Sequence, residues 1–250
     1  MNLLVAVLTS RDVEKLKRCI ESVLSQTSDV VVVCNTLDFS FVEQAKVVAE
    51  TYNLEFLVTE SNGTPAKGKN SVLGIFRTRS YDYYMQVDAD DYLAPDALIK
   101  LAKIVDENPD VDVVGLVDGF VTCDGSATTS NAFLTDGNVF EFADVQGVNK
   151  LRLAELGKLL LNNLPYNRML LYSNKALDTF NFDENFIGSE DIVASYKLYY
   201  NSDINYVLTN VHLYVYDLED NGNFHPFLSN PTEVKKTIRE LKVILNETRI

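Results

Sequence analysis

The chain is poor in several residues that mark common protein classes. Its 250 residues include three cysteines, two histidines and no tryptophan, and only 22 lysines and arginines stand against 36 aspartates and glutamates. The cysteines Cys19, Cys34 and Cys123 are odd in number and widely spaced, so they predict neither a disulfide framework nor a zinc site. We therefore expect a protein of a reducing compartment, the cytoplasm.

The shortage of basic residues restricts the partners. With a net charge of −14, the chain lacks the basic face that binding along a phosphate backbone or on an anionic membrane requires. Extended nucleic-acid binding is therefore not expected, although contact with a single modified base is compatible with this charge. No apolar run approaches the roughly 18 residues of a membrane span, and the apolar stretch before Thr9 is too short for a signal peptide.

Apolar runs and helical patterns alternate regularly through the first 120 residues. The runs predict strands at 3–8, 29–34, 54–58, 83–87 and 111–117, and helices between them at 12–26, 41–52, 66–79 and 95–105. This order favours parallel strands with crossover helices. Further along, we expect a loop or hairpin at 122–138, helices at 145–162, 191–200 and 231–247, and one or two strands within 206–216.

The predicted fold class is therefore α/β, with a mostly parallel central sheet, flanking helices and a variable C-terminal third. The sequence shows no convincing linker, so residues 1–250 are expected to form one domain. In this interpretation residues 1–120 are one half, residues 121–230 the other, and residues 231–250 a terminal helix.

Three carboxylates follow the fourth predicted strand. Asp88, Asp90 and Asp91 stand where an apolar strand runs into a turn, and ligands of open α/β sheets bind at the carboxyl ends of strands. The carboxylates repel one another, and a hard divalent cation such as Mg²⁺ or Mn²⁺ would offset that repulsion. The alternative is that Asp90 and Asp91 cap the next helix and Asp88 is solvated.

A basic segment precedes this acidic cluster. Residues 60–80 contain four basic residues against one acidic residue, whereas residues 82–120 contain ten acidic residues against two basic ones. The basic segment leads from a Gly/Pro turn into a helix start, where backbone N–H groups favour anions. The basic segment beside the acidic cluster suits a diphosphate bridged to a cation. The alternative is that the basic segment forms a helix with a solvated basic face.

A second acidic site lies at Ser189-Glu190-Asp191. Ser189 is a plausible N-cap, which would place both acidic residues in the first helical turn, where negative charge is favoured. The functional alternative makes Asp191 a general base that takes a proton from an attacking hydroxyl group.

These motifs, in this order, resemble the GT-A-fold glycosyltransferases of family 2. The resemblance covers about residues 3–118 and 165–217 and is carried by five segments: residues 5–10 with 16–27, 62–63 with 69–70, the V-D-A-D-D run at 87–91, the F-D-E…G-S-E-D run at 182–191, and Y-V-Y at 214–216. It implies a Rossmann-like GT-A fold. It also implies a nucleotide-diphosphate sugar donor, Mn²⁺ or Mg²⁺, and inverting single displacement onto an unidentified hydroxyl acceptor.

The resemblance also implies roles for individual residues. Asp90 would contact the metal, with Asp88 towards the ribose and Asp91 beside them; Asp191, with Glu190, would form the catalytic pair. Other positions would border the nucleotide or its phosphates: Thr9, Arg11, Lys69 and Asn70.

The sequence also departs from the family pattern. Asn35 replaces the usual acidic residue that reads the base or ribose, although it can hydrogen-bond a base edge. The lack of tryptophan rules out a Gln-x-x-Arg-Trp motif, which points away from processive, membrane-embedded synthases. His225 is a candidate late metal or phosphate ligand, whereas His212 suits a structural role.

Two other functions remain open at this point. A sugar-phosphate nucleotidyltransferase would normally carry a glycine-rich loop after the first strand, and residues 8–12 contain no glycine. A non-catalytic nucleotide-binding scaffold is the second alternative. The acceptor is not indicated: a glycan, a lipid carrier, a small molecule and a hydroxymethylated DNA base all fit.

Overall fold

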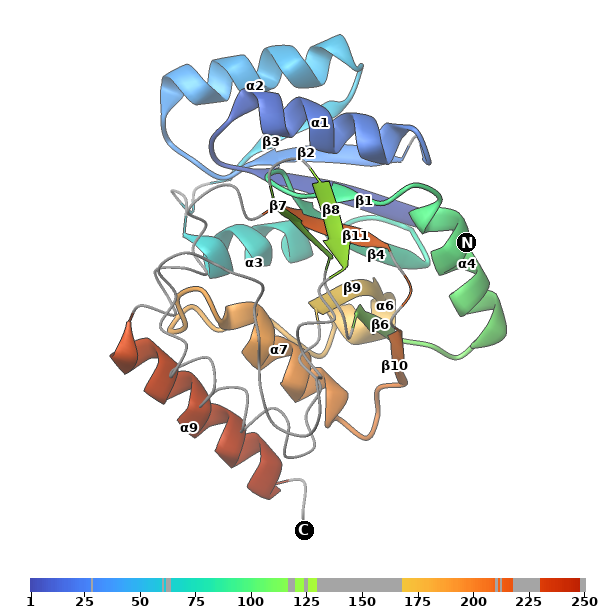
Figure 1. Cartoon of the computed structure of the whole chain (residues 1–250), viewed down its shortest axis with the longest axis vertical. Coiled ribbons are helices and arrows are strands. Elements are labelled where there is room, and N and C mark those ends of the chain that lie inside the picture. The colour runs from blue at the N-terminus through green and yellow to red at the C-terminus, as the bar shows by residue number, and fades with distance from the viewer. Residues whose placement is uncertain are drawn as a thin grey trace.

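Seven strands form the central sheet of the computed structural model, which describes residues 1–27, 29–59, 61, 64–116, 120–123, 126–129, 168–209, 211, 213–217 and 230–247 (Figure 1). Their order across the sheet is β10-β6-β9-β4-β1-β2-β3. The strands are β1 (Leu3–Thr9), β2 (Val30–Cys34), β3 (Glu55–Val58), β4 (Tyr83–Asp88), β6 (Val113–Leu116), β9 (Arg168–Ser173) and β10 (Tyr206–Thr209). Only β9 runs antiparallel to its neighbours within this sheet, so the predicted mostly parallel α/β fold is confirmed.

A smaller sheet begins where β4 ends. Its order is β5-β11-β7-β8, and its strands are β5 (Tyr92–Leu93), β11 (Tyr214–Asp217), β7 (Phe120–Cys123) and β8 (Ser126–Thr129). β7 and β8 pair antiparallel, which agrees with the hairpin alternative for the described residues of the segment 122–138; the rest of that segment lies outside the described residues. Because β5 pairs with β11, residues just beyond the acidic turn contact a strand more than 120 positions later in the chain.

Helices cover both faces of the central sheet (Figure 1). The first face carries α1 (Val13–Leu24), α2 (Phe39–Thr51) and α4 (Ala97–Glu107); the second carries α3 (Pro65–Phe76), α6 (Asn174–Leu177) and α7 (Glu190–Tyr199). Alternate side chains of β1 serve the two faces: Leu3, Val5 and Val7 pack on the first, and Leu4, Ala6 and Leu8 on the second. Such two-sided burial explains the unbroken apolar runs in the sequence.

The helices begin where local chemistry allows. The Asp12 carboxylate accepts hydrogen bonds from the first N–H groups of α1, and Asp38 does the same for α2. Pro65 occupies the first turn of α3, where its missing N–H costs nothing. α4 begins at Ala97 after Asp96, so the alternative interpretation of Asp90 and Asp91 as its caps is wrong.

Later elements agree in part with expectation. The strand prediction at 206–216 is confirmed as β10 and β11, and the terminal helix is α9 (Pro231–Glu247), which packs on α7. The sequence patterns did not predict β5, β9 or α6, and the helix expected at 145–162 lies outside the described residues. Of the helices that the structure describes, none is long and apolar enough to cross a bilayer.

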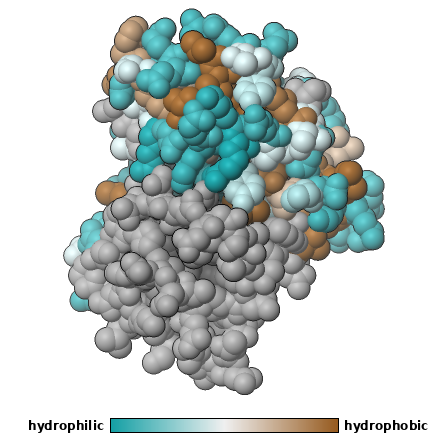
Figure 2. Space-filling model, turned by 45° about the horizontal axis from the view of Figure 1, so that its top comes forward, coloured by the Kyte–Doolittle hydropathy of each residue, from teal (hydrophilic) through white to brown (hydrophobic). Residues whose placement is uncertain are grey.

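The surface that these elements present is mixed. Figure 2 shows hydrophilic residues gathered in an area that borders the grey residues, with hydrophobic residues in separate smaller areas. The exposed large apolar side chains come from different elements and loops, among them Leu37, Phe39 and Ile99. Exposed apolar residues of this kind are normal on a folded protein.

Candidate active site

The carboxyl ends of three neighbouring strands meet at the acidic turn. Leu8 of β1 is in register with Asp88 of β4, and the Ala89 N–H donates to the Leu8 carbonyl at 2.9 Å. The Asn35 N–H, just after β2, donates to the Thr9 carbonyl at 2.6 Å. Three polar segments that lie far apart in sequence are thus brought to one edge of the sheet, where ligands of such folds bind.

The three carboxylates of the turn lie in different environments. Asp88 is half-buried, the Asp90 side chain is 37% exposed, and Asp91 is only 1% exposed. Arg11 lies beside Asp90, with 3.7 Å between its guanidinium Nη2 and the carboxylate Oδ2. Asp88 and Asp90 can therefore reach a ligand from solvent, whereas Asp91 faces the protein interior.

Helix α1 holds this turn from one side. Arg18 donates to the Asp90 carbonyl at 2.8 Å and lies over the Tyr92 ring. The Cys19 thiol donates to the Asp88 carbonyl at 3.8 Å. Burial raises the pKa of Cys19 well above its ordinary value, and the charges of Asp91, Asp88 and Asp90 raise it further. The thiol therefore stays protonated behind a strongly negative turn.

Strand β11 also holds the turn. The Tyr214 hydroxyl donates to Asp91 Oδ2 at 2.6 Å and accepts from the Asp88 N–H at 3.3 Å. Tyr214 is itself buried. One phenol therefore contacts both ends of the turn.

A second charged cluster joins α3 to α7. Lys69 lies with its Nζ 2.7 Å from Glu190 Oε1 and 3.9 Å from Asp191 Oδ2. Lys69 is 9% exposed and Glu190 3%, whereas about a third of the Asp191 side chain is exposed. Glu190 Oε2 is buried without a hydrogen-bond partner among the described residues. Asp191 is therefore the member of the cluster that solvent reaches most readily.

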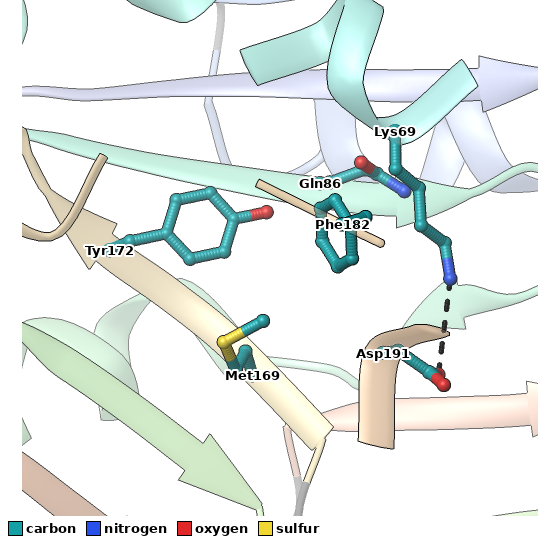
Figure 3. Close-up of a pocket in the computed structure, with 6 residues that line it drawn as sticks. All are labelled: Lys69, Gln86, Met169, Tyr172, Phe182 and Asp191. Atoms are coloured by element: carbon teal, nitrogen blue, oxygen red, sulfur yellow. Dashed lines mark ion pairs between the residues drawn. The ribbon is translucent and has the colours of Figure 1, made fainter. Parts of the chain in front are cut away.

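A pocket lies beside the second cluster and extends to Gln86 of β4. Lys69, Gln86 and Asp191 line it on the polar side and Met169, Tyr172 and Phe182 on the apolar side (Figure 3). Gln86 also donates from Nε2 to Asp88 Oδ1 at 3.0 Å. Gln86 thus contacts the first carboxylate of the acidic turn and lines the same cavity as Asp191 at the first turn of α7.

Two predicted site residues have both ends of their amides engaged within the protein. Asn70 donates to the Phe182 carbonyl at 2.9 Å and accepts from the Phe182 N–H at 2.8 Å, which fastens the segment before α7 to α3. Asn35 donates to the Thr64 carbonyl and accepts from the hydroxyls of Thr59 and Ser61. A Cβ on Gly68 would collide with the hydrogen-bonded Asn35 amide, so this close approach favours glycine.

The structure also gives partners to the basic segment. Lys67 lies 3.9 Å from Glu184, and Arg79 lies 2.6 Å from Glu55. Arg77 donates to the carbonyls of Leu177 and Phe180. With Lys69 bound to Glu190, this segment is a set of structural contacts and not an unpaired cationic surface.

Few side chains in the described part of the chain could hold a metal ion. There, no group of three or more His, Cys, Asp and Glu residues is arranged to hold a metal ion. Two partly exposed carboxylates, Asp88 and Asp90, nonetheless suit Mg²⁺ or Mn²⁺, which proteins bind through one or two carboxylates with water and phosphate oxygens completing the shell. His225, His212 and the Asn62-Gly63 motif lie outside the described residues.

Sequence reasoning missed three residues that shape the site. Gln86 is a polar residue inside an otherwise apolar strand, two positions before Asp88 and so on the same face, and that spacing was a usable signal. Arg18 lies on the polar part of a helix and carried no comparable signal. The sequence indicated Tyr214 only as a member of the Y-V-Y motif, with no role at the acidic turn.

Comparison with known proteins decides the family. The sequence profile described as "Glycosyl transferase family 2" matches residues 5–175. The chain belongs to glycosyl transferase family 2. No curated protein matches this family 2 chain.

Solved structures share its fold at low identity. S. aureus TarS (residues 1–349) in complex with UDP-GlcNAc is 19% identical, with a TM-score of 0.64 over 98% of this chain and 66% of that one. Mycobacterium tuberculosis glucosyl-3-phosphoglycerate synthase in complex with Mg²⁺ and UDP is 13% identical, with a TM-score of 0.60 over 97% and 79%. A Pyrobaculum calidifontis mannosyltransferase in complex with GDP-Man and Mn²⁺ is 14% identical, with a TM-score of 0.56 over 97% and 69%.

These similarities confirm the expected GT-A fold for this family 2 chain. The chain spans just under two thirds of the TarS 1–349 chains that it matches, at 65–66%, and 43% of a longer TarS chain. The bound molecules belong to those other proteins, and only the fold carries over at such identities.

Proposed function

We propose that this family 2 chain is a metal-dependent, inverting glycosyltransferase that moves a sugar from a nucleoside diphosphate sugar to a hydroxyl acceptor. The observation that carries the proposal is the junction of the two acidic clusters: Gln86 hydrogen-bonds Asp88 and lines the same pocket as Asp191. One cluster suits a cation with a diphosphate, and the other suits a general base. The similarity to structures that contain UDP or GDP-Man supports this choice of donor.

On the donor side, Asp88 and Asp90 are the residues that would hold Mn²⁺ or Mg²⁺. When bound, the cation would neutralise charge on the departing diphosphate. Arg11, half-exposed beside Asp90, is placed to contact phosphate oxygens. Thr9 and Asn35 lie at the adjoining strand ends, where their backbone can border the nucleotide. His225 is kept as a candidate further ligand.

On the acceptor side, Asp191 would take the proton of the attacking hydroxyl group. The acceptor oxygen forms a bond to the anomeric carbon as the bond from that carbon to the diphosphate oxygen breaks, which inverts the configuration. Lys69 puts a positive charge beside both carboxylates, 2.7 Å from Glu190 and 3.9 Å from Asp191. Glu190, the second member of the proposed catalytic pair, binds Lys69 directly. Its role would therefore be to position Asp191 and not to take the proton.

The proposal extends to the organisation of the chain. Residues 1–120 would bind the donor and residues 121–230 would shape the acceptor side, within one domain that ends in the helix at 231–250. The acceptor would be a glycan, a lipid carrier, a small molecule or a hydroxymethylated DNA base. The buried free thiols of Cys19 and Cys34 support a reducing compartment such as the cytoplasm.

A panel of UDP- and GDP-sugars with Mn²⁺ tests the function. We expect one donor to raise the melting temperature and to be hydrolysed slowly, and EDTA to abolish both effects. Stabilisation without turnover in the presence of acceptors would favour a nucleotide-binding scaffold. Pyrophosphate formation from a nucleoside triphosphate and a sugar phosphate would favour a nucleotidyltransferase.

Asp191→Asn tests the base. Loss of a general base typically lowers turnover by about 10²–10⁴-fold, so we expect a fall in kcat of this size with donor affinity nearly unchanged. Glu107→Gln is the matched control, since this exposed carboxylate at the end of α4 contacts only Lys103 among its recorded ion pairs. Full turnover by Asp191→Asn would exclude this residue as the base.

A further inference from the structure

Tyr214 occupies an unusual position for a buried tyrosine. Its ring is 2% exposed, and its hydroxyl reaches from the smaller sheet to the end of β4 in the central sheet. There it donates to Asp91 Oδ2 at 2.6 Å and accepts from the Asp88 N–H at 3.3 Å. The O–H···O⁻ distance is that of a charge-assisted hydrogen bond, which is stronger than a neutral one.

Asp91 differs in burial from the other two carboxylates of the turn. It is 1% exposed, whereas Asp88 and Asp90 are partly exposed. A metal ligand in this site must face the same space as the diphosphate that shares the cation. A buried carboxylate costs stability unless hydrogen bonds compensate it, and Tyr214 supplies one such bond.

Hydrogen bonds from α1, from β11 and within the turn hold its backbone. The Asp91 N–H donates to the Asp88 carbonyl at 2.9 Å, the Arg18 guanidinium donates to the Asp90 carbonyl, and Tyr214 accepts from the Asp88 N–H. These bonds fix the peptide groups around Asp88 and Asp90. The backbone conformation of the turn then determines the direction in which both side chains point.

We propose that Tyr214 and Asp91 form a positioning pair that holds Asp88 and Asp90 in the geometry required for a divalent cation, and that Asp91 is not itself a metal ligand. The inference rests on the proposed metal-dependent function and revises the sequence-based expectation for Asp91. It predicts that removing one remote hydroxyl group weakens metal-dependent nucleotide binding although every candidate ligand remains in place.

Tyr214→Phe in the full chain tests the pair. Calorimetry would measure the binding of UDP and GDP with and without Mn²⁺, and electron paramagnetic resonance would measure Mn²⁺ binding in the presence of nucleotide. We expect about tenfold weaker Mn²⁺-dependent binding, with metal-free nucleotide binding almost unchanged. Such a tenfold change corresponds to about 1.4 kcal/mol.

Tyr84→Phe is the matched control. Its hydroxyl is equally buried on β4 but donates to the Arg79 carbonyl at 2.7 Å, away from the acidic turn. Its hydroxyl also accepts from the Tyr81 N–H at 3.3 Å, so Tyr84→Phe loses one donated and one accepted hydrogen bond, as Tyr214→Phe does. It therefore reports what general destabilisation does to metal binding. Equal losses in Tyr84→Phe and Tyr214→Phe would overturn the positioning role.

Asp91→Asn separates positioning from ligation. If the two residues form a positioning pair, Asp91→Asn weakens Mn²⁺ binding no more than Tyr214→Phe does. The double variant then binds Mn²⁺ as tightly as the single variant that has the lower Mn²⁺ affinity. If Asp91 were a ligand, Asp91→Asn would abolish Mn²⁺ binding as Asp90→Asn does, and Tyr214→Phe would have little effect. A wild-type chain that binds no nucleotide with Mn²⁺ would overturn the proposed function as well, whereas normal binding by both wild type and Tyr214→Phe would overturn the pair alone.

Discussion

Lys69 lies between two acidic side chains at the first turn of α7. Its Nζ contacts Glu190 at 2.7 Å in a region where both side chains are almost fully buried. A buried ion pair adds little over an apolar pair of the same shape, but removing one partner leaves an uncompensated charge. The stability of this part of the site therefore depends on keeping both charges or neither.

Lys69→Met should for this reason be strongly destabilising. We expect the free energy of unfolding to fall by about 3 kcal/mol, because Glu190 would stay buried without its counter-charge. The double variant Lys69→Met/Glu190→Gln should recover most of this loss. Urea unfolding of the three proteins would measure both effects.

The control for this prediction lies two residues away on the same helix. Lys67 is exposed, with its Nζ 3.9 Å from Glu184, and exposed pairs contribute only about 0–1 kcal/mol. Lys67→Met should therefore unfold at nearly the wild-type urea concentration. A loss in Lys69→Met no larger than in Lys67→Met would show that the Lys69–Glu190 pair is unimportant for stability.

Helix α9 supports the acidic end of α7. Thr237 is fully buried and its hydroxyl lies 2.7 Å from that of Ser189, the residue that precedes α7. Ser189 stands at the N-cap as expected, but its side chain makes no capping bond and contacts Thr237 instead. The orientation of Glu190 and Asp191 is thus linked to a helix that begins 40 residues later.

Thr237→Val tests this link with little change of shape. The substitution leaves the buried Ser189 hydroxyl without its partner, so we expect a loss of about 1–2 kcal/mol in stability. Hydrogen exchange at the first turn of α7 should become faster. Thr232→Val, at an exposed position of the same helix, should change neither quantity. Unchanged exchange in Thr237→Val would mean that α7 keeps its N-terminal turn without α9.

The elements that the sequence predicted are those defined by local patterns. β1 and β2 are unbroken apolar runs, and α1 has its apolar stripe and its Asp12 cap, so each could be read from a window of residues. β9 could not be read in this way. It inserts antiparallel between β4 and β6, and such pairing depends on distant partners.

The same distinction applies to the site. The acidic turn was predictable, because a strand end followed by D-A-D-D is a local feature. The meeting of Lys69 with Glu190 was not, since it joins residues 121 positions apart through the packing of α3 on α7. Nor did any local pattern show that Asp91 is buried while Asp90 is partly exposed.

At the scale of the whole molecule, one of the many carboxylates, Asp112, hydrogen-bonds to segments that lie far apart in the sequence. Asp112, just before β6, is buried and accepts hydrogen bonds from Lys175 at 2.8 Å, from Ser173 at 3.0 Å and from the Asn205 N–H at 2.9 Å. These partners belong to α6, to the end of β9 and to the residue before β10. A single carboxylate therefore connects β6, β9, α6 and β10 at the edge of the central sheet.

The charge of Asp112 makes this edge sensitive to acid. Burial by itself raises the pKa of Asp112, but the hydrogen bonds from Lys175, Asn205 and Ser173 outweigh it and leave the pKa below its ordinary value. A carboxyl whose pKa is lower in the folded than in the unfolded state stabilises the fold above its unfolded pKa of about 3.9 and loses that contribution as pH falls through the folded value.

We therefore expect Asp112→Asn to be less stable than wild type by about 2 kcal/mol at pH 6, where wild-type Asp112 is ionised. The difference should shrink as pH falls below about 4, because wild-type Asp112 then gains a proton and loses the same interactions. Urea unfolding between pH 6 and pH 3 measures the two curves. Asp110→Asn, an exposed carboxylate two residues away, should follow the wild-type curve throughout. Parallel curves for wild type and Asp112→Asn would show that the ionised state of Asp112 contributes nothing, since only a group that titrates differently in the folded and unfolded chain can make the curves converge.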